Sequence, residues 1–108
     1  MKRGEIWLID FDPSRGKEQK KVRPALIIGS DHLNGLPIRI ILPITGTQRI
    51  THVAITASQD NGLIKDSFID TVQIKSFSNE RLIKKMGVID NMTFAKVLAK
   101  VSHNLGLN

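Results

Sequence analysis

Short apolar segments separated by turn residues fill the first two-thirds of the 108-residue chain. They are rich in Ile, Val and Leu, and several alternate apolar with polar positions, which is typical of β-strands. The pattern predicts five strands, at residues 5–12, 24–29, 38–44, 51–56 and 67–74. Polar connections containing Gly, Pro, Asn or Asp separate these strands, and we place them at residues 12–21, 31–37, 46–50 and 59–62. The connection at 12–21 contains Pro13 and Gly16, and we expect it to be a mobile loop.

The last third of the chain changes to a helical pattern. Residues 78–87 can form a short helix with Ser78 or Asn79 as its cap. In residues 90–107, apolar side chains recur every three or four positions, which predicts an amphipathic helix that begins near Asp90. We expect the apolar face to pack on the sheet; it consists of Phe94, Val97, Leu98, Val101 and Leu105. We expect the polar face to point away; it consists of Lys96, Lys100 and Asn104.

Short strands followed by a closing helix predict a mainly β protein, a small and strongly bent sheet or barrel with helices attached. A chain of this length is expected to form one domain, residues 1–108, with a core modest enough that dimerisation would add stability. No apolar stretch approaches the length of a membrane span and no signal peptide is visible, so we expect a cytoplasmic protein without membrane contact. The absence of cysteine excludes disulfides and thiol catalysis.

The charge of the chain gives the first indication of a partner, because sixteen Lys and Arg residues outnumber ten Asp and Glu residues. The net charge of +6 suits a polyanionic partner, such as nucleic acid, an acidic protein or a membrane surface, or belongs to a generically basic protein. Five of the basic residues fall within nine positions, with Glu18 as the acidic residue among them: Arg15, Lys17, Lys20, Lys21 and Arg23. Arg23 directly precedes Pro24, so it is either solvated or aimed from a rigid strand end at an anion.

Few residues outside this basic segment suggest a binding or catalytic role. The three histidines have no metal-ligand spacing, and neither a Walker loop nor a glycine-rich dinucleotide fingerprint is present, so we expect no metal and no cofactor. Thr45 and Thr47 follow a predicted strand end, and hydroxyls beside an arginine fork make a reasonable phosphate site, although turn threonines often bond to nearby backbone. His52 is an acid–base candidate, but its apolar surroundings in the sequence favour a packed or backbone-bonded role.

Aromatic residues are few, which bears on how a nucleic acid would be bound. Trp7 and Phe11 share one face of the first predicted strand, and we expect them in the core rather than as exposed platforms for stacking bases. Phosphate contacts would then dominate the affinity for a nucleic acid, and binding would weaken with salt.

Several spaced motifs follow one another in a distinctive order. They are Arg3-Gly4-Glu5-Ile6-Trp7, Asp12-Pro13, Gly16-Lys17-Glu18-Gln19, Arg23-Pro24, and the segments at 42–47, 51–53, 62–68, 73–77 and 80–87. Together with the terminal helix, this series resembles the MazF/PemK/Kid family of toxin endoribonucleases over essentially the whole chain. The resemblance implies an SH3-like β-barrel with flanking helices, acting as a homodimer. It also implies sequence-specific cleavage of single-stranded RNA, mRNA in particular, without a metal, and neutralisation by an acidic antitoxin with a partly disordered C-terminal tail.

Metal-free cleavage of RNA uses the substrate's own 2′-hydroxyl as nucleophile, giving a 2′,3′-cyclic phosphate and a free 5′-hydroxyl. The resemblance makes Arg23 the catalytic arginine, with Thr45 fixing the phosphate and Glu18 in the loop that closes over RNA. Glu18, with Lys17, is our candidate for proton transfer, and a salt bridge within the loop is the equally plausible structural alternative for Glu18. The remaining predicted RNA contacts are Lys17, Gln19, Lys20, Lys21, Thr47, Gln48 and Lys75.

Two departures from the family pattern keep alternatives open. The plasmid-encoded branch carries an Arg-x-Asp pair where this chain has Asp70-Thr71-Val72, so that branch's acid and base cannot be transferred. Lys75 stands where the family usually has arginine, which keeps the charge but loses the bidentate fork. The alternatives are a poison of DNA gyrase with the same fold, as in CcdB relatives, and an RNA-binding relative without activity. The chain lacks the Trp-Gly-Ile terminus of the CcdB relatives.

Overall fold

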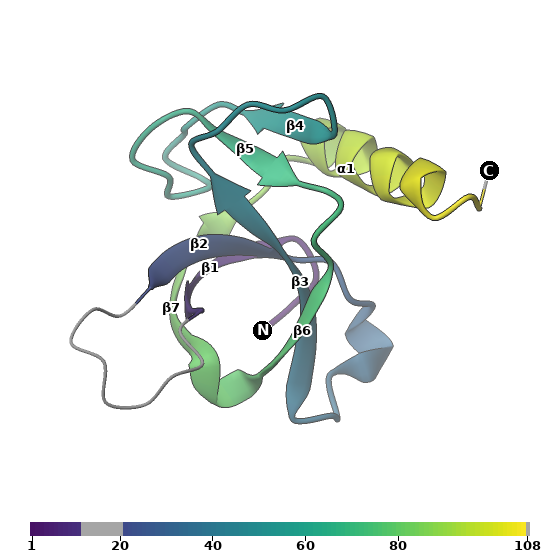
Figure 1. The fold of residues 1–108 in the computed structure, drawn as a ribbon. Helices are drawn as coiled ribbons and strands as arrows, with labels where there is room; N and C mark the ends of the chain where they lie inside the picture. Colours follow the sequence, from purple (N-terminus) through teal and green to yellow (C-terminus); the bar gives the residue numbers. More distant parts are fainter. Residues whose placement is uncertain (12–20, 108) are drawn as a thin grey trace.

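The computed structural model describes residues 1–11 and 21–107 of the chain. Four of the predicted site residues, Lys17, Glu18, Gln19 and Lys20, lie outside the described residues. The described elements, in chain order, are β1 (Glu5–Asp10), β2 (Val22–Ile27), the 3-10 turn η1 (Asp31–Leu33), β3 (Ile38–Thr45), β4 (His52–Ile55), β5 (Ser67–Asp70), β6 (Lys75–Ser78), the 3-10 turn η2 (Asn79–Arg81), β7 (Leu82–Val88) and α1 (Asn91–Asn104) (Figure 1).

All the strand pairings are antiparallel, and one strand organises them. The strands run in the order β4-β5-β3-β2-β1-β7, and β6 pairs with β3 as well. The first half of β3 pairs with β6, its last residues pair with β5, and β2 lies along its other edge. The result is a strongly bent sheet that is not closed into a complete barrel. The prediction of a mainly β fold with a C-terminal helix is confirmed.

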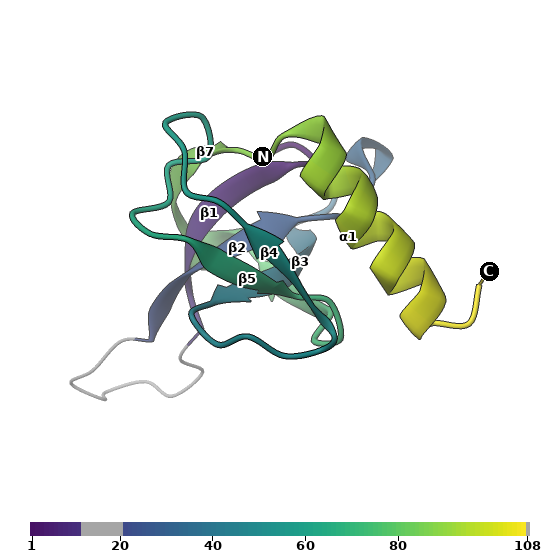
Figure 2. The same ribbon diagram turned by 90° about the horizontal axis from the view of Figure 1, so that it is seen from above.

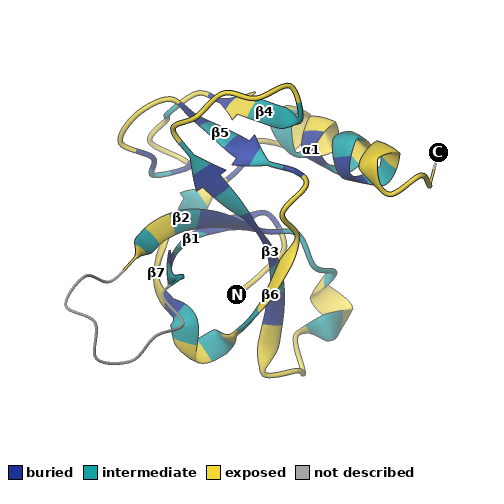
Figure 3. Ribbon diagram, in the orientation of Figure 1, coloured by how far each residue is buried: buried dark blue, intermediate teal, exposed yellow. Residues whose placement is uncertain are grey.

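Both faces of the central strands are buried, because successive side chains of a strand point to opposite faces. Leu26 and Leu42 are cross-strand partners in one core cluster, while Ala25 and Ile27 face the other cluster with Ile41. α1 covers the first cluster and lies along one side of the strands (Figure 2). Figure 3 shows this burial concentrated in the central strands and on the inner side of α1.

The terminal helix behaves largely as predicted. The Asp90 side chain caps it by accepting from the Thr93 amide at 2.9 Å, and Val97 and Val101 are buried against the sheet. Two details of the prediction are wrong. Leu105 lies beyond the last helical residue and is exposed, and Asn104 does not point away, since its Nδ2 donates to Thr71 Oγ1 at 3.0 Å. Within the described residues, no helix is both long and apolar enough to cross a bilayer.

Two other sequence expectations are wrong. Residues 78–87 do not form a helix: Ser78 caps only the single turn η2, and the chain then extends as β7, because the free edge of β1 offers its backbone groups a partner. The strand predicted at 67–74 is interrupted after Asp70. The Asp70 carboxylate accepts from the amides of Val72 and Gln73, and this local turn separates β5 from β6.

Glu5, from the opening motif, joins β1 to β7 and to the Trp7 ring. Its Oε1 accepts from Trp7 Nε1 and from the Lys2 amide, both at 2.9 Å, and Lys85 Nζ lies 3.1 Å from Oε2. Burial raises the pKa of the Glu5 carboxyl, but these donors outweigh it and hold the pKa at about 2, below the 4.5 of an unperturbed glutamate. The motif residue is therefore structural in this fold.

Glu5→Gln is expected to lower the free energy of unfolding by about 2–3 kcal/mol near neutral pH. The folded pKa is depressed, so the stabilisation is complete above pH 4.5 and is lost progressively as the pH falls toward 2. Urea unfolding of both proteins along this range should therefore show curves that converge in acid. Glu80→Gln, at an exposed carboxylate, is the control. A constant gap at all pH values would contradict this account.

The backbone of β7 lies directly against the loop before β5. The Val88 amide donates to the Asp60 carbonyl at 2.8 Å, and a Cβ added at Gly87 would collide with that carbonyl oxygen and with the Asn61 backbone. Gly62, with φ +73°, makes the matching approach to the Met86 carbonyl. Only glycine fits here, because neither backbone can yield without breaking the contact between them.

Gly87→Ala is accordingly expected to lower the free energy of unfolding by about 3 kcal/mol, the cost of overpacking a rigid backbone contact. Gly35→Ala, where an added Cβ meets no atom within 4 Å, is the matched control and should change stability little. Urea unfolding checks both variants. Equal stability of the two variants would show that the loop can move away from β7 at no cost.

Candidate functional site

A cleft of about 340 Å³ opens where β2, β3 and β5 meet the segments that follow β3 and β5. Its lining is Phe11, Lys21, Arg23, Pro43, Thr45, Thr47, Arg49, His52, Asp70, Gln73 and Lys75. A larger hollow of about 740 Å³ lies beside the start of α1, but its charged lining residues are Asp60, Asp90 and Lys96, without an arginine. The first cleft gathers the basic and hydroxyl residues that the sequence singled out, so we take it as the candidate site.

Strand register places the two main candidates on the same face of the sheet. Ala25 of β2 lies opposite Pro43 of β3, Arg23 lies two residues from Ala25 along β2, and Thr45 lies two residues from Pro43 along β3. Side chains two apart in a strand share a face, so Arg23 and Thr45 both point to the side occupied by Pro43. The exposed Arg23 therefore presents its guanidinium from the start of a strand that pairs with β1 at Arg23 and with β3 from Ala25 onward, as expected for a charge held in a rigid frame.

The hydroxyl of Thr45 is fixed by the loop that it begins. Thr45 Oγ1 accepts from the Thr47 amide at 3.2 Å, a local bond that holds the turn after β3. A hydroxyl that accepts through its oxygen still has its own proton to donate. Thr45 can therefore both shape the turn and donate to a ligand in the cleft.

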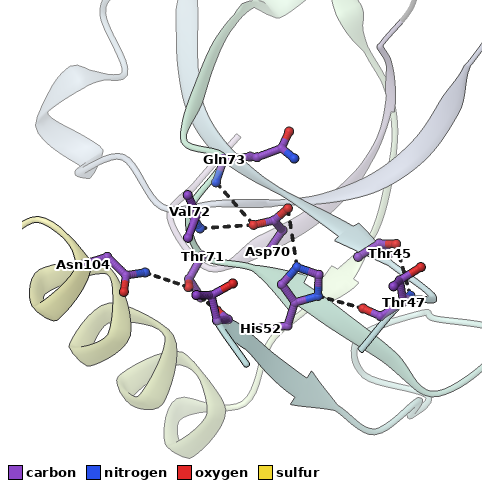
Figure 4. A network of polar contacts seen from close by, with 9 residues as sticks. Thr45, Thr47, His52, Asp70, Thr71, Val72, Gln73 and Asn104 are labelled. Carbon is purple, nitrogen blue, oxygen red and sulfur yellow. Dashed lines mark hydrogen bonds and ion pairs between the residues drawn. The ribbon is translucent and has the colours of Figure 1, made fainter. Parts of the chain in front are cut away.

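His52 and Asp70, which are cross-strand partners in β4 and β5, also line the cleft (Figure 4). His52 Nδ1 lies 2.7 Å from the Thr47 carbonyl oxygen, and His52 Nε2 lies 3.5 Å from Asp70 Oδ2. Asp70 Oδ1 accepts from the amides of Val72 and Gln73 at 3.1 and 3.3 Å. The backbone-bonded role considered for His52 is confirmed, but the residue lies in the candidate site as well.

The charge of the cleft is strongly positive. Among the described residues, four exposed cations line it: Lys21, Arg23, Arg49 and Lys75. Asp70 is the one carboxylate of the described lining, and its oxygen atoms face His52 and the turn amides. Such an arrangement attracts a phosphate group, and arginines supply forked donors that match its oxygen atoms. Within the described residues, no group of three or more potential metal ligands gathers.

The structure brings together five of the predicted site residues and adds others. Lys21, Arg23, Thr45, Thr47 and Lys75 all line the cleft, whereas Gln48 is exposed on the same loop but is not part of the lining. The prediction that Phe11 is only a core residue is incomplete: Phe11 packs edge-on against Phe77 at 5.1 Å and also lines the cleft. Trp7 packs against the core as predicted.

Sequence reasoning left Arg49, Asp70 and Gln73 out of the site. Asp70 was noted only as a departure from a family motif, and its place opposite His52 depends on the pairing of β4 with β5. Alternation in the sequence places Phe68 and Asp70 on one face of β5, but only the pairing of β5 with β3 shows that this is the face of Thr45. Arg49 and Gln73 follow strand ends in irregular turns, for which the sequence carries no comparable periodicity.

Comparisons with known proteins identify the family of the chain. The chain belongs to the family of PemK-like, MazF-like toxins of type II toxin–antitoxin systems, whose family model matches residues 2–105. It is 34% identical over 113 residues to the endoribonuclease MazF of Staphylococcus saprophyticus, with 100% of this chain and 93% of the relative covered. It is 31% identical over 105 residues to endoribonuclease MazF9 of Mycobacterium tuberculosis, with 90% and 89% covered.

Solved structures show the same fold at lower sequence identity. The crystal structure of MazE–MazF (Form-II) from Deinococcus radiodurans matches with a TM-score of 0.83 and 21% identity, covering 100% of this chain and 97% of the other. An endoribonuclease in complex with its cognate antitoxin, from a mycobacterial species, matches with a TM-score of 0.81, 21% identity and the same coverage. The arrangement of a bent antiparallel sheet with a C-terminal helix is therefore common to these proteins.

Proposed function

We propose that this chain is a toxin endoribonuclease that cuts single-stranded RNA, mRNA in particular, at a short sequence motif and without a metal ion. The observation that carries the proposal is the meeting of Arg23 and Thr45 on one face of the sheet, inside a cleft lined by further cations. Relatives that match along almost the whole chain are endoribonucleases, which supports the same activity here.

The proposed reaction is an attack of the RNA 2′-hydroxyl on the adjacent phosphorus. The bond from the 2′-oxygen to phosphorus forms while the bond from phosphorus to the 5′-oxygen breaks, leaving a 2′,3′-cyclic phosphate and a 5′-hydroxyl. The proton of the 2′-hydroxyl passes to a base, and the departing 5′-oxygen receives a proton from an acid. The protein supplies no nucleophile, which suits a chain without cysteine.

Arg23 is proposed to stabilise the negative charge that develops on the phosphate oxygen atoms, since its fork can donate to two of them. Thr45 is proposed to hold the same phosphate through its hydroxyl proton. Glu18, with help from Lys17, remains our candidate for proton transfer. The position of Arg23 on an anchored strand supports its assignment most directly, because electrostatic catalysis requires donors that are fixed in advance.

The other cations and polar residues are proposed to hold the RNA on either side of the scissile phosphate. Lys21, Thr47 and Lys75 line the cleft, and Gln48 lies on the loop beside it. Lys75 offers a point charge rather than a fork, so it suits backbone attraction more than recognition of one base. The other proposed contacts are Lys17, Gln19 and Lys20.

We propose that the partner is an acidic antitoxin with a partly disordered tail, because a positive cleft attracts an acidic chain as it attracts RNA. Solved relatives with this fold include complexes of a toxin with its antitoxin. A homodimer acting in the cytoplasm, where mRNA is found, completes the proposal. Poisoning of DNA gyrase, the activity of CcdB relatives, is the competing function of the same fold.

Purified protein is expected to cut a long mixed-sequence RNA in EDTA at a recurring short motif, leaving 5′-hydroxyl ends. Arg23→Ala should cut about 10²- to 10³-fold more slowly, the usual loss when one electrostatic donor is removed. Arg23→Lys keeps the charge without the fork and should recover only part of that loss. Mapping the 5′ ends and measuring initial rates checks both variants.

Lys96→Ala, at an exposed cation on α1 outside the cleft, is the matched charge control and should cut at the wild-type rate. RNA left intact by the wild type would overturn the proposal, and inhibition of DNA gyrase by the same preparation would favour the alternative. RNA that is bound but not cut would identify an inactive relative.

Affinity for a non-cleavable single-stranded oligonucleotide should fall linearly on a plot of log K against log salt concentration. Lys75→Ala is expected to reduce the steepness of that plot by about 0.7, the contribution of one phosphate contact to a single strand. Lys96→Ala should leave the slope unchanged. Fluorescence anisotropy over a salt series measures the slopes, and equal slopes for wild type and Lys75→Ala would exclude Lys75 from contact with phosphate.

A further inference from the structure

We infer that His52 and Asp70 form a clamp that holds the two walls of the cleft at a fixed separation for RNA, a positioning device that rests on the function proposed above. The first wall is the segment 45–51, which carries Thr45, Thr47 and Arg49. The second is the turn at 70–73, which carries Gln73 and leads to β6. Most of both walls lies outside the strand ladders. Their relative position therefore depends on side chains.

One pair of largely covered side chains contacts the backbone of both walls. His52 Nδ1 reaches the Thr47 carbonyl oxygen at 2.7 Å, and Asp70 Oδ1 accepts from the Val72 and Gln73 amides. The link between the two is the approach of His52 Nε2 to Asp70 Oδ2 at 3.5 Å, which is an ion pair when the imidazole is protonated (Figure 4). The side chains of His52 and Asp70 are only 3% and 13% exposed, so the contact is largely shielded from water.

The geometry indicates that His52 and Asp70 position the walls of the cleft and do not transfer a proton to or from RNA. A general acid or base needs an atom within hydrogen-bond reach of the substrate. Both nitrogen atoms of His52 face protein acceptors, and the two oxygen atoms of Asp70 face the turn amides and His52. A carbonyl oxygen only accepts, so His52 Nδ1 is the donor to Thr47, and neither nitrogen atom of His52 is left pointing at a bound RNA. The pair thus acts through Thr47 and Gln73 rather than on RNA itself.

A neighbouring contact maintains the fold when the clamp is removed. Thr71, fully buried, donates from Oγ1 to the Thr51 carbonyl and accepts from Asn104 of α1. The ladder between β4 and β5 continues through Val53, Ala54 and Ile55. The Thr71–Thr51 bond also joins the two walls at one end, so loss of the His52–Asp70 contact is expected to loosen residues 46–50 without unfolding the sheet.

The test uses His52→Leu, which removes both contacts, and His52→Gln, whose amide can donate to Asp70 from the position of Nε2. His52→Leu should raise KM for a cleavable RNA about tenfold, as expected for the loss of a charged contact, with kcat changed less than about threefold. His52→Gln should recover much of the loss. In an Asp70→Ala background, Gln should be no better than Leu, because its partner is gone. His103→Leu, at an exposed histidine of α1, is the control.

Amide hydrogen exchange in the RNA-free protein tests the clamp independently of cleavage. Asp70→Ala is expected to speed exchange across residues 46–50 on the opposite wall, which Asp70 reaches through His52. If exchange there rises but no RNA is cut by any variant, the clamp stands and the proposed function fails. Unchanged exchange in this segment would overturn the clamp. A large fall in kcat at constant KM in His52→Leu would also overturn it, by making His52 a catalytic residue.

Discussion

The sharing of β3 between two groups of strands is the constraint on which the rest of the molecule depends. Its first half pairs with β6, its end pairs with β5, and β2 follows its other edge. Because side chains alternate along each strand, these pairings direct Arg23, Thr45 and Lys75 to the same side of the sheet. The bend that lets β3 serve both groups also provides the hollow into which these side chains point. The cleft therefore depends on the pairing of the strands more than on any single residue.

Among the described residues, no carboxylate forms an ion pair with the four cations of the cleft, so other contacts must keep the cleft ordered. The structure meets this requirement by fixing the walls with neutral or shielded contacts and leaving the cations exposed. The Thr45 hydroxyl holds the turn after β3. Asp70 holds the turn after β5 through Oδ1, while its Oδ2 faces His52. Carboxylates that neutralised Arg23 or Lys75 directly would compete with a phosphate for the same donors. The positive charge is thereby kept available to a ligand.

Local patterns in the sequence were sufficient for much of the fold. Alternation predicted the strands near their observed positions, and helical spacing with the Asp90 cap predicted α1. The error at 78–87 has a tertiary cause, because a segment with a helix-like cap becomes a strand when β1 offers an unpaired edge. Arg23 and Thr45 were accessible through motif spacing. Asp70 was not, since its value to the cleft depends on its pairing with His52, and no local pattern encodes the pairing of strands.

The arrangement of β3 also sets how much of the chain must be synthesised before the cleft can assemble. Its neighbours come from residues 22–27, 67–70 and 75–78, so β3 remains incompletely paired until the chain up to residue 78 has left the ribosome. The nascent chain has no assembled cleft before that point, because Lys75 and the turn after Asp70 are still missing. The proposed RNA-cleaving site therefore cannot be complete while most of the chain is still being translated. The order of strands in the sheet thus delays assembly of the cleft until late in translation.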